Sequence, residues 1–325
     1  MKIIMPMAGL GKRMRPHTWS KPKPLLQVAG KPVLGHILDQ FVPLKNLEEV
    51  VFIVGWMGDQ IRDYVEKNYR FDARFVTQEE LMGQAHAVYL AREYLRGPCL
   101  ILFVDTLFEA DLTRLEHIEA DGVIFVKEMD DPRPFGAIVE ENGRIVRYIE
   151  KPPTCEHRKT TIGVFYVREG AALERAIAYL LEHNIRTRGE FYMADAFQRM
   201  MDEGAYFISE PVEVWEDCGQ PETLLHTNRY LLDHGRAHMP PTAQGVLIPP
   251  VYVADTAVIE NAIVGPYASI GEGAVIREAL VRDTIVEAGA LIERALIEHS
   301  LIGRNVRIQG TMRTLNIGDD DVLTI

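Results

Sequence analysis

The chain has 325 residues, a formal net charge of −12 and a pI near 5.4. Its length predicts about two domains of ~100–200 residues each, and its 47% hydrophobic and 25% charged residues are ordinary for a globular protein. The acidic charge argues against a nucleic-acid-binding face, no run approaches the ~18 apolar residues of a membrane span, and Pro6 interrupts the only apolar run near the start that could resemble a signal peptide. We therefore expect a cytoplasmic protein without a membrane or nucleic-acid partner, in which Cys99, Cys155 and Cys218 are free thiols.

The first notable feature is a basic stretch with two glycines, residues 9–24, which follows the apolar residues 3–5. In α/β proteins a turn of this kind after a strand binds phosphates, because glycine can take positive φ and lets backbone N–H groups approach an anion. Residues 1–38 contain seven Lys or Arg and no Asp or Glu. The side chains expected to bring positive charge to the turn are Arg13, Arg15, Lys21 and Lys23. In an acidic chain this local charge predicts a polyphosphate site, although the spacing fits neither a P-loop nor a dinucleotide fingerprint.

Strand-like and helix-like segments alternate from the start of the chain to about residue 235. The apolar runs 50–54, 100–104 and 123–126 are typical of parallel strands that are covered on both faces, and 60–65 and 87–95 are amphipathic segments between them. The pattern predicts an α/β fold, with a Rossmann-like, mostly parallel sheet and helices on both faces. Ligands of such sheets bind at the C-terminal ends of the strands.

Asp105 is expected directly after the strand 100–104, where a carboxylate can ligate Mg²⁺, although an Asp after a strand is more often a helix cap. Farther on, residues 135–139 and 145–149 flank Asn142-Gly143, a dipeptide that favours a tight turn with two residues of positive φ. We expect a β-hairpin there.

The composition and the hydrophobic pattern of the sequence change after residue 235. Residues 236–250 contain four prolines and are predicted to form a linker. From residue 251 to the end we expect a second domain, because aliphatic residues recur there every five or six positions. The recurring residues are Val253, Ile259, Val264, Ile270, Ile276, Val281, Val286, Ile292, Ile297, Ile302 and Ile308. This period is typical of the hexapeptide repeat of a short left-handed parallel β-helix.

Several segments together resemble the sugar nucleotidyltransferases, the nucleotide-sugar pyrophosphorylases. Gly9, Gly11, Arg13, Met14, Pro16, Thr18, Lys23 and Leu25 match the family's signature. Trp215 to Pro221 resembles its Trp-x-Asp-x-Gly-x-Pro segment. The resemblance covers almost the whole chain, since many members carry a hexapeptide tail, and the most similar branch is that of the glucose-1-phosphate thymidylyl- and uridylyltransferases. Family members join an NTP and a sugar 1-phosphate into an NDP-sugar and release pyrophosphate.

The resemblance implies a role for individual residues of this sequence. Nucleotide-binding residues would be Ala8, Gly9, Gly11, Lys12, Arg13, Gln78 and Gly83. Sugar-binding residues would be Gly136, Glu150, Lys151 and Gly163. Arg13 would contact the β- and γ-phosphates, Lys23 the α-phosphate and Lys151 the sugar phosphate, while Asp105 and Asp217 would hold the cofactor Mg²⁺.

The choice of base is expected to depend on Gln78, five residues before Gly83. An amide offers a donor and an acceptor to a pyrimidine, whereas a carboxylate only accepts and suits guanine. Gln78 therefore favours dTTP or UTP, with glucose 1-phosphate as the first choice of sugar and N-acetylglucosamine 1-phosphate as another. If Glu79 were the base-contacting residue instead, a guanylyltransferase making GDP-mannose would be favoured.

Two further alternatives come from other classes of protein. A non-catalytic regulatory relative would share the two-domain plan, but the intact Arg13, Lys23, Asp105 and Asp217 argue against it. An acetyltransferase built on the hexapeptide domain would need a catalytic histidine, and His299 is the only histidine in the repeats. We expect the tail to serve assembly or regulation, and the protein to be a homo-oligomer.

Overall fold

The structure is a computed structural model that describes residues 1–241, 244–312 and 317. The helices are α1 (Val33–Asp39), α2 (Gly58–Asn68), α3 (Gln84–Leu90), α4 (Gly170–Glu182), α5 (Met193–Asp202) and α6 (Pro221–Leu231). Short 3-10 helices span Lys12–Met14, His17–Trp19, Lys23–Leu25, Arg92–Tyr94 and Leu112–His117. Within the described residues, none of the helices has the length and apolarity that a membrane-crossing segment needs.

The strands of the N-terminal part are β1 (Lys2–Pro6), β2 (Gln27–Val28), β3 (Lys31–Pro32), β4 (Glu49–Val54), β5 (Ala73–Thr77), β6 (Cys99–Leu102), β7 (Thr106–Glu109), β8 (Gly122–Glu128), β9 (Gly136–Glu141), β10 (Arg144–Glu150), β11 (Lys159–Val167), β12 (Phe207–Pro211) and β13 (Val214–Asp217). Those of the C-terminal part are β14 (Gln244–Leu247), β15 (Tyr252–Val253), β16 (Val258–Val264), β17 (Ser269–Ile270), β18 (Val275–Arg277), β19 (Leu280–Val286), β20 (Leu291–Glu293), β21 (Leu296–Ile302) and β22 (Arg307–Gln309).

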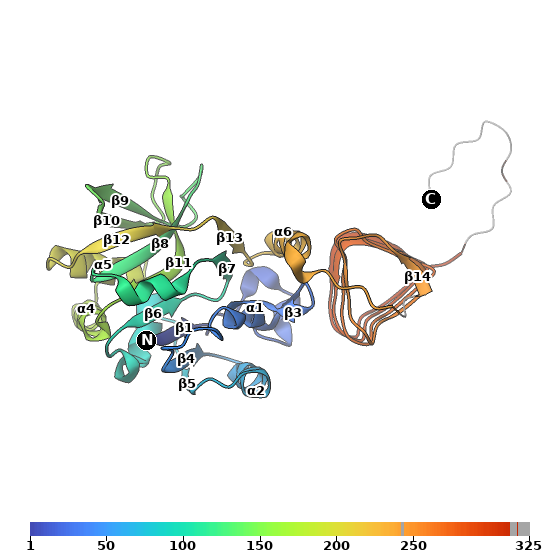
Figure 1. Cartoon of the computed structure of the whole chain (residues 1–325), viewed down its shortest axis with the longest axis horizontal. Helices are drawn as coiled ribbons and strands as arrows, with labels where there is room; N and C mark the ends of the chain where they lie inside the picture. Colours follow the sequence, from blue (N-terminus) through green and yellow to red (C-terminus); the bar gives the residue numbers. More distant parts are fainter. Residues whose placement is uncertain (242–243, 313–316, 318–325) are drawn as a thin grey trace. The chain divides into compact units, whose positions relative to one another are not determined.

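The chain forms two compact units (Figure 1). The first contains Met1–Leu26 and Lys31–Leu224, and the second contains Gln27–Gly30 and the described residues from Leu225 onward. The division falls inside α6, whereas the sequence pattern suggested residue 235. Part of the predicted linker 236–250 is also a strand, because β14 pairs with β16.

The main sheet of the first unit is mixed. Strands β6, β1, β4 and β5 are neighbours and run parallel, as the sequence predicts. Strand β11 lies next to β6 and pairs antiparallel with β6, β8 and β9. The predicted strand 123–126 is part of β8, which therefore has the antiparallel β11 on one side and the parallel β12 on the other. The cause is the β9–β10 hairpin, which returns the chain in the opposite direction. Asn142 and Gly143 have the expected positive φ values of 51° and 77°.

Burial on both faces explains why the central strands are continuously apolar. Ile4 and Val51 belong to a cluster with buried residues of α3, α4 and α5, such as Val88, Ile177 and Phe197. Their neighbours in β1 and β4, which alternate to the opposite face, are also buried. Cys99 lies in this core, where burial raises the pKa of its thiol to about 12. All three cysteines are free, as predicted, and Cys155 is the exposed one.

The second unit is dominated by a nine-stranded parallel sheet, and Figure 1 shows these strands stacked in successive turns of the chain. The recurring aliphatic residues of the sequence pair with one another in three columns. The columns are Val253–Ile270–Val286–Ile302, Ile259–Ile276–Ile292–Ile308 and Leu247–Val264–Val281–Ile297. Their side chains form one hydrophobic cluster with the buried alanines between them.

Candidate active site

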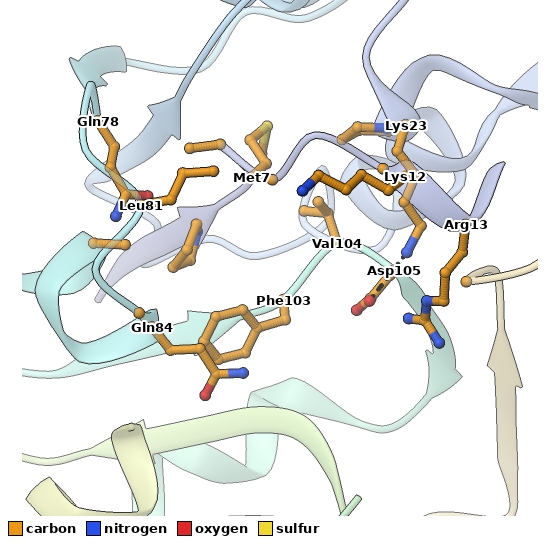
Figure 2. A pocket seen from close by; sticks show the side chains of 18 of the residues that line it. Met7, Lys12, Arg13, Lys23, Gln78, Leu81, Gln84, Phe103, Val104 and Asp105 are labelled. Atoms are coloured by element: carbon orange, nitrogen blue, oxygen red, sulfur yellow. Dashed lines mark hydrogen bonds and ion pairs between the residues drawn. The ribbon is translucent and has the colours of Figure 1, made fainter. Parts of the chain in front are cut away.

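A pocket of about 430 Å³ opens beside the C-terminal end of β1, a volume in the range of small-ligand sites. Its lining includes Ala8, Gly9, Gly11, Lys12, Arg13, Lys23, Gln78, Gly83 and Asp105. Figure 2 shows Lys12, Arg13, Lys23 and Asp105 on one side of this pocket and Gln78 and Leu81 on the other. Every residue predicted to bind the nucleotide therefore lines one cavity.

The glycine turn after β1 has one glycine whose conformation is demanding. Gly11 has φ 58°, and a Cβ there would lie 3.0 Å from Cγ2 of Thr18 and 3.1 Å from Cβ of Lys23. Thr18 also donates from its hydroxyl to the carbonyl of Gly11 at 2.9 Å. Gly9 differs from the expectation, because its φ is not positive and a Cβ there would meet nothing within 4 Å. Space for a ligand, not backbone strain, is the reason to expect glycine at that position.

Three of the cations near the turn line the pocket, namely Lys12, Arg13 and Lys23. Arg15 and Lys21, which were expected to join them, do not line it. The guanidinium of Arg15 lies over the ring of Trp19, 4.7 Å from the centroid. Arg15 follows the 3-10 turn Lys12–Met14, in which Met14 is buried, and has an extended backbone. Fewer cationic side chains therefore line the pocket than the sequence suggested.

Pairing of β7 with β13 brings two distant aspartates together. Asp217 is opposite Thr106 in this antiparallel ladder, and the N–H of Cys218 donates to the carbonyl of Asp105 at 2.9 Å. Asp105 was expected directly after a strand, but β6 ends at Leu102, so Asp105 lies in the turn between β6 and β7. Its side chain accepts a bond from Nζ of Lys23 at 3.0 Å.

The two carboxylates have opposite pKa shifts. Burial opposes the ionisation of Asp105, but the ammonium of Lys23, assisted by Arg13, outweighs it and lowers the pKa. For Asp217, burial and the negative charge of Asp105 raise the pKa, although the N–H of Gly219 donates to its Oδ1 at 2.8 Å. Two neighbouring carboxylates that disfavour each other's charge are stabilised by a shared cation.

Asp105 and Asp217 fit a site for Mg²⁺, which takes hard oxygen donors and is often held by one or two carboxylates together with substrate phosphates. Within the part of the chain that the structure describes, no group of three or more His, Cys, Asp or Glu side chains is arranged to hold a metal ion. A metal at this pair would therefore need further oxygen ligands from the substrate or from water.

The loop between β5 and α3 supplies the opposite wall. Gln78 is 6% exposed and its backbone N–H donates to Val54 at the end of β4, whereas Glu79 is exposed and does not line the pocket. Gly83, with φ 114°, precedes α3, and a Cβ there would lie 2.5 Å from the carbonyl oxygen of Phe191. Only glycine fits this close approach of two backbone segments.

The residues predicted to bind the sugar do not line this pocket but gather in a neighbouring cluster. Gly136 and Glu150 are opposite each other in the β9–β10 hairpin, and Lys151 follows with φ 48° and its Nζ 3.4 Å from the hydroxyl of Tyr192. Burial raises the pKa of Glu150, while Lys151 opposes that shift.

Gly163 reaches the pocket through one intermediate residue. Its carbonyl accepts from the N–H of Phe103, and Phe103 lines the pocket. Phe103, Leu81, Gln84 and Gly219 also line the cavity without having been predicted to do so, although Gly219 stands in the Trp-x-Asp-x-Gly segment. Apolar side chains such as Phe103 and Leu81 give no local signal that separates a ligand contact from a core contact.

The cavity is lined by a glycine turn, a group of cations and Asp105, and Asp217 lies beside Asp105 outside the lining. A mixed α/β sheet with such a cavity at the ends of its strands is typical of α/β proteins that bind nucleotides. Residues 1–234 match the model of the nucleotidyl transferase family, so the chain belongs to that family, whose members are enzymes.

The chain is similar to proteins of two kinds, and the matches cover different shares of those proteins. The chain is 28% identical to the bifunctional protein GlmU of Methanococcus vannielii, over 81% of this chain and 62% of that protein. It is 32% identical to GlmU of Ralstonia nicotianae, over 89% of this chain and 67% of that protein. A glucose-1-phosphate thymidylyltransferase of Streptomyces griseus is 28% identical over 95% of this chain and 93% of its own length. The chain thus spans about two thirds of these GlmU proteins and nearly all of the thymidylyltransferase.

Solved structures share the fold at low identity. A UDP-glucose pyrophosphorylase complexed with UDP-glucose superposes with a TM-score of 0.61, at 18% identity, over 72% of this chain and 98% of that one. A nucleoside-diphosphate-sugar pyrophosphorylase from Vibrio cholerae gives a TM-score of 0.59, at 21% identity, over 70% and 99% of the two chains. These similarities show a common fold.

Proposed function

We propose that the protein transfers a nucleotidyl group from UTP or dTTP to a sugar 1-phosphate, giving an NDP-sugar and pyrophosphate. The observation that carries this proposal is the single cavity lined by the glycine turn, Arg13, Lys23, Asp105 and Gln78. The names of the relatives, which include a thymidylyltransferase and a pyrophosphorylase, support the same class of reaction.

The reaction needs alignment and charge neutralisation more than proton transfer. An oxygen of the sugar phosphate attacks the α-phosphorus, the bond to the β-phosphate oxygen breaks, and pyrophosphate leaves with the electron pair. Because the nucleophile is already ionised at neutral pH, no general base is required. The enzyme has to hold the groups in line and stabilise the negative charge that passes to pyrophosphate.

The cations of the site are assigned by their position. Arg13 would contact the β- and γ-phosphates and the leaving group, and Lys23 the α-phosphate. Lys23 also bonds to Asp105, so substrate phosphate would compete with that carboxylate for its ammonium. Lys151 would bind the sugar phosphate. At an effective dielectric near 20, like charges ~4 Å apart repel by about 4 kcal/mol, which these side chains must offset.

Asp105 and Asp217 would hold Mg²⁺. The bound ion would supply positive charge to the phosphates and so favour departure of pyrophosphate. The raised pKa of Asp217 beside Asp105 supports this assignment, because a cation would relieve their repulsion.

A pyrimidine base is supported by the loop that contains Gln78. Gln78 is buried against the pocket, whereas Glu79 is exposed and outside it. This arrangement favours UTP or dTTP over the alternative of a guanylyltransferase that makes GDP-mannose.

The sugar is proposed to be a glucose-type hexose bound near Gly136, Glu150 and Gly163. Glucose 1-phosphate is supported by the thymidylyltransferase relative that matches over most of its length. N-acetylglucosamine 1-phosphate with UTP is the second candidate, favoured by the GlmU relatives.

The second unit is proposed to be a short left-handed β-helix that serves assembly of a homo-oligomer. Its paired columns, in which partners such as Val253 and Ile270 are 17 residues apart, support about three hexapeptides per coil. His299 bonds to Asp283 at 2.7 Å, and Asp283 is also paired with Arg229 of α6, so His299 belongs to an ion-pair cluster of the second unit.

The decisive test is pyrophosphate release with Mg²⁺. UTP, dTTP, GTP, ATP and CTP would each be combined with glucose 1-phosphate, N-acetylglucosamine 1-phosphate or mannose 1-phosphate. Activity confined to UTP or dTTP supports the proposal, and a preference for GTP would reverse the base assignment. Folded protein without activity in any combination would favour a non-catalytic regulatory relative.

A further inference from the structure

The base loop contains a histidine that none of the roles above uses. His86, on α3, has its ring Nδ1 3.3 Å from Nε2 of Gln78. Gln78 lines the pocket and is buried, whereas His86 is half-buried and is not among the described residues that line the cavity. His86 is therefore linked to the pocket by its contact with the amide of Gln78.

In the structure the nitrogen end of the Gln78 amide faces His86. An amide nitrogen only donates, so Nδ1 must accept, and the ring must be neutral with its proton on Nε2. The surroundings favour the neutral ring: burial lowers the pKa of His86 below its usual 6.5, Glu80 opposes that shift and Arg186 adds to it. Glu80 belongs to the same loop and Arg186 to the segment after α4, and these are the charged groups that face the ring.

An amide held in this way presents a defined pattern to a ligand. Its nitrogen is turned toward His86, so its carbonyl oxygen lies on the other side, with one amide hydrogen still free to donate. Figure 2 shows the Gln78 side chain extending among the side chains that line the pocket. The carbonyl oxygen of Gln78 can then accept from N3–H of uracil or thymine, and the amide hydrogen beside it can donate to O4. Reversal of the amide exchanges the two and complements cytosine instead.

We propose that His86 is a positioning residue that orients the Gln78 amide and thereby selects uracil and thymine nucleotides over cytosine nucleotides. The inference deepens the proposed function and rests on it. It assigns base selection to a pair of side chains, in which Gln78 touches the base and His86 sets the direction of its amide.

The charge state of His86 should then change the selectivity. A protonated ring donates from both nitrogens, so its Nδ1–H can bond to Gln78 only through the carbonyl oxygen, and the amide reverses. Because the pKa of His86 is lowered from 6.5, the ring is neutral at pH 7 and becomes charged only at more acidic pH. Preference for UTP over CTP should therefore be constant near neutrality and fall in acid.

The experiment compares kcat/KM for UTP and CTP, with the same sugar 1-phosphate, from about pH 5.5 to about pH 8. The ratio of the two values cancels titrations that the nucleotides share, such as that of the terminal phosphate. His86→Asn offers Gln78 both an acceptor and a donor and does not titrate, and His86→Phe keeps a ring without an acceptor. His183→Phe, on the exposed end of α4, is the matched control.

We expect the wild-type ratio to fall in acid, the ratio in His86→Asn to show no dependence on pH, and His86→Phe to lower the ratio about tenfold at neutral pH, the effect of one hydrogen bond. His183→Phe should behave as the wild type. A wild-type ratio that does not change with pH, or an unchanged ratio in His86→Phe, would overturn the inference while leaving the proposed function intact.

Absence of turnover with every nucleotide would instead overturn the proposed function. The inference would then be decided by the ratio of the UTP and CTP dissociation constants, measured by calorimetry on the wild type and the same variants. Equal ratios in all of them would overturn it.

Discussion

Arg13 carries the largest share of the proposed chemistry at the scale of single residues. It lines the pocket, and its Nη2 lies close to Gly219 and Asp217. Arg13→Ala should lower kcat by on the order of 100-fold, because a charge-stabilising donor of the transition state is lost. The measurement is steady-state pyrophosphate release.

Arg15→Ala is the matched control for this variant. It removes the same charge two residues away, but Arg15 stacks on Trp19 outside the pocket. An unchanged kcat in Arg13→Ala, or an equal loss in both variants, would remove Arg13 from the mechanism.

Gly11 can be tested by a comparison of two glycines with similar backbone angles. Gly11 and Gly97 have φ values of 58° and 65°, but only Gly11 has side chains near its missing Cβ. Gly11→Ala and Gly97→Ala should each lose about 1–2 kcal/mol of stability through the left-handed backbone. Only Gly11→Ala should also lower kcat/KM, by roughly tenfold, because its methyl group would push Thr18 and Lys23. Equal kcat/KM values in the two variants would contradict this role.

At the scale of elements, helix α6 has a buried residue that joins three segments of the second unit. Oδ1 of Asn228 accepts from the N–H of Ala29 at 2.9 Å and from the hydroxyl of Ser269 at 2.6 Å, and Nδ2 donates to the carbonyl of Tyr267 at 3.0 Å. These bonds explain why residues 27–30, which follow the basic turn in sequence, belong to the second unit.

Asn228→Ala should destabilise the protein by about 1–3 kcal/mol, because buried polar groups would lose their partner. Urea denaturation followed by circular dichroism measures the loss. Asn68→Ala removes an exposed asparagine that donates one bond, at the end of α2, and should change stability by less than about 0.5 kcal/mol. If both variants lost a similar amount of stability, the loss in Asn228→Ala could not be attributed to its buried hydrogen bonds.

At the scale of the whole molecule, assembly is proposed to use an apolar strip on the second unit. Val246, Ile263, Leu280 and Leu296 are consecutive partners across four parallel strands. Leu296 is 83% exposed and Val246 is 58% exposed. A row of exposed aliphatic side chains on a sheet marks an interaction surface.

Ile263→Lys combined with Leu296→Lys should convert the proposed oligomer to monomers, because charges on the strip would be buried without partners. Light scattering after size-exclusion chromatography gives the mass. Glu116→Gln, a change of one charge unit on an exposed residue of the first unit, should leave the mass unchanged. A monomeric wild-type protein would contradict the assembly proposal.

Local patterns were enough to predict the glycine turn, the tight turn at Asn142 and the aliphatic period of the second unit. The two turns depend on the backbone preferences of individual residues, and the period depends on the burial of about every sixth residue. Both can be recognised from residues that are close in the sequence. Family membership followed from the same short motifs and is confirmed by the match over residues 1–234.

Contacts between residues far apart in the sequence could not be predicted and became known from the folded chain. The contacts of Asp105 with Lys23 and Cys218, and of Gln78 with His86, join segments whose pairing no local pattern specifies. The antiparallel neighbours of β11 were also missed, and the contacts that group residues 27–30 with those after Leu224 likewise join distant segments. The physical reason is that strand pairing and helix docking are set by packing between surfaces that the chain brings together from far apart, and many pairings satisfy the same local preferences.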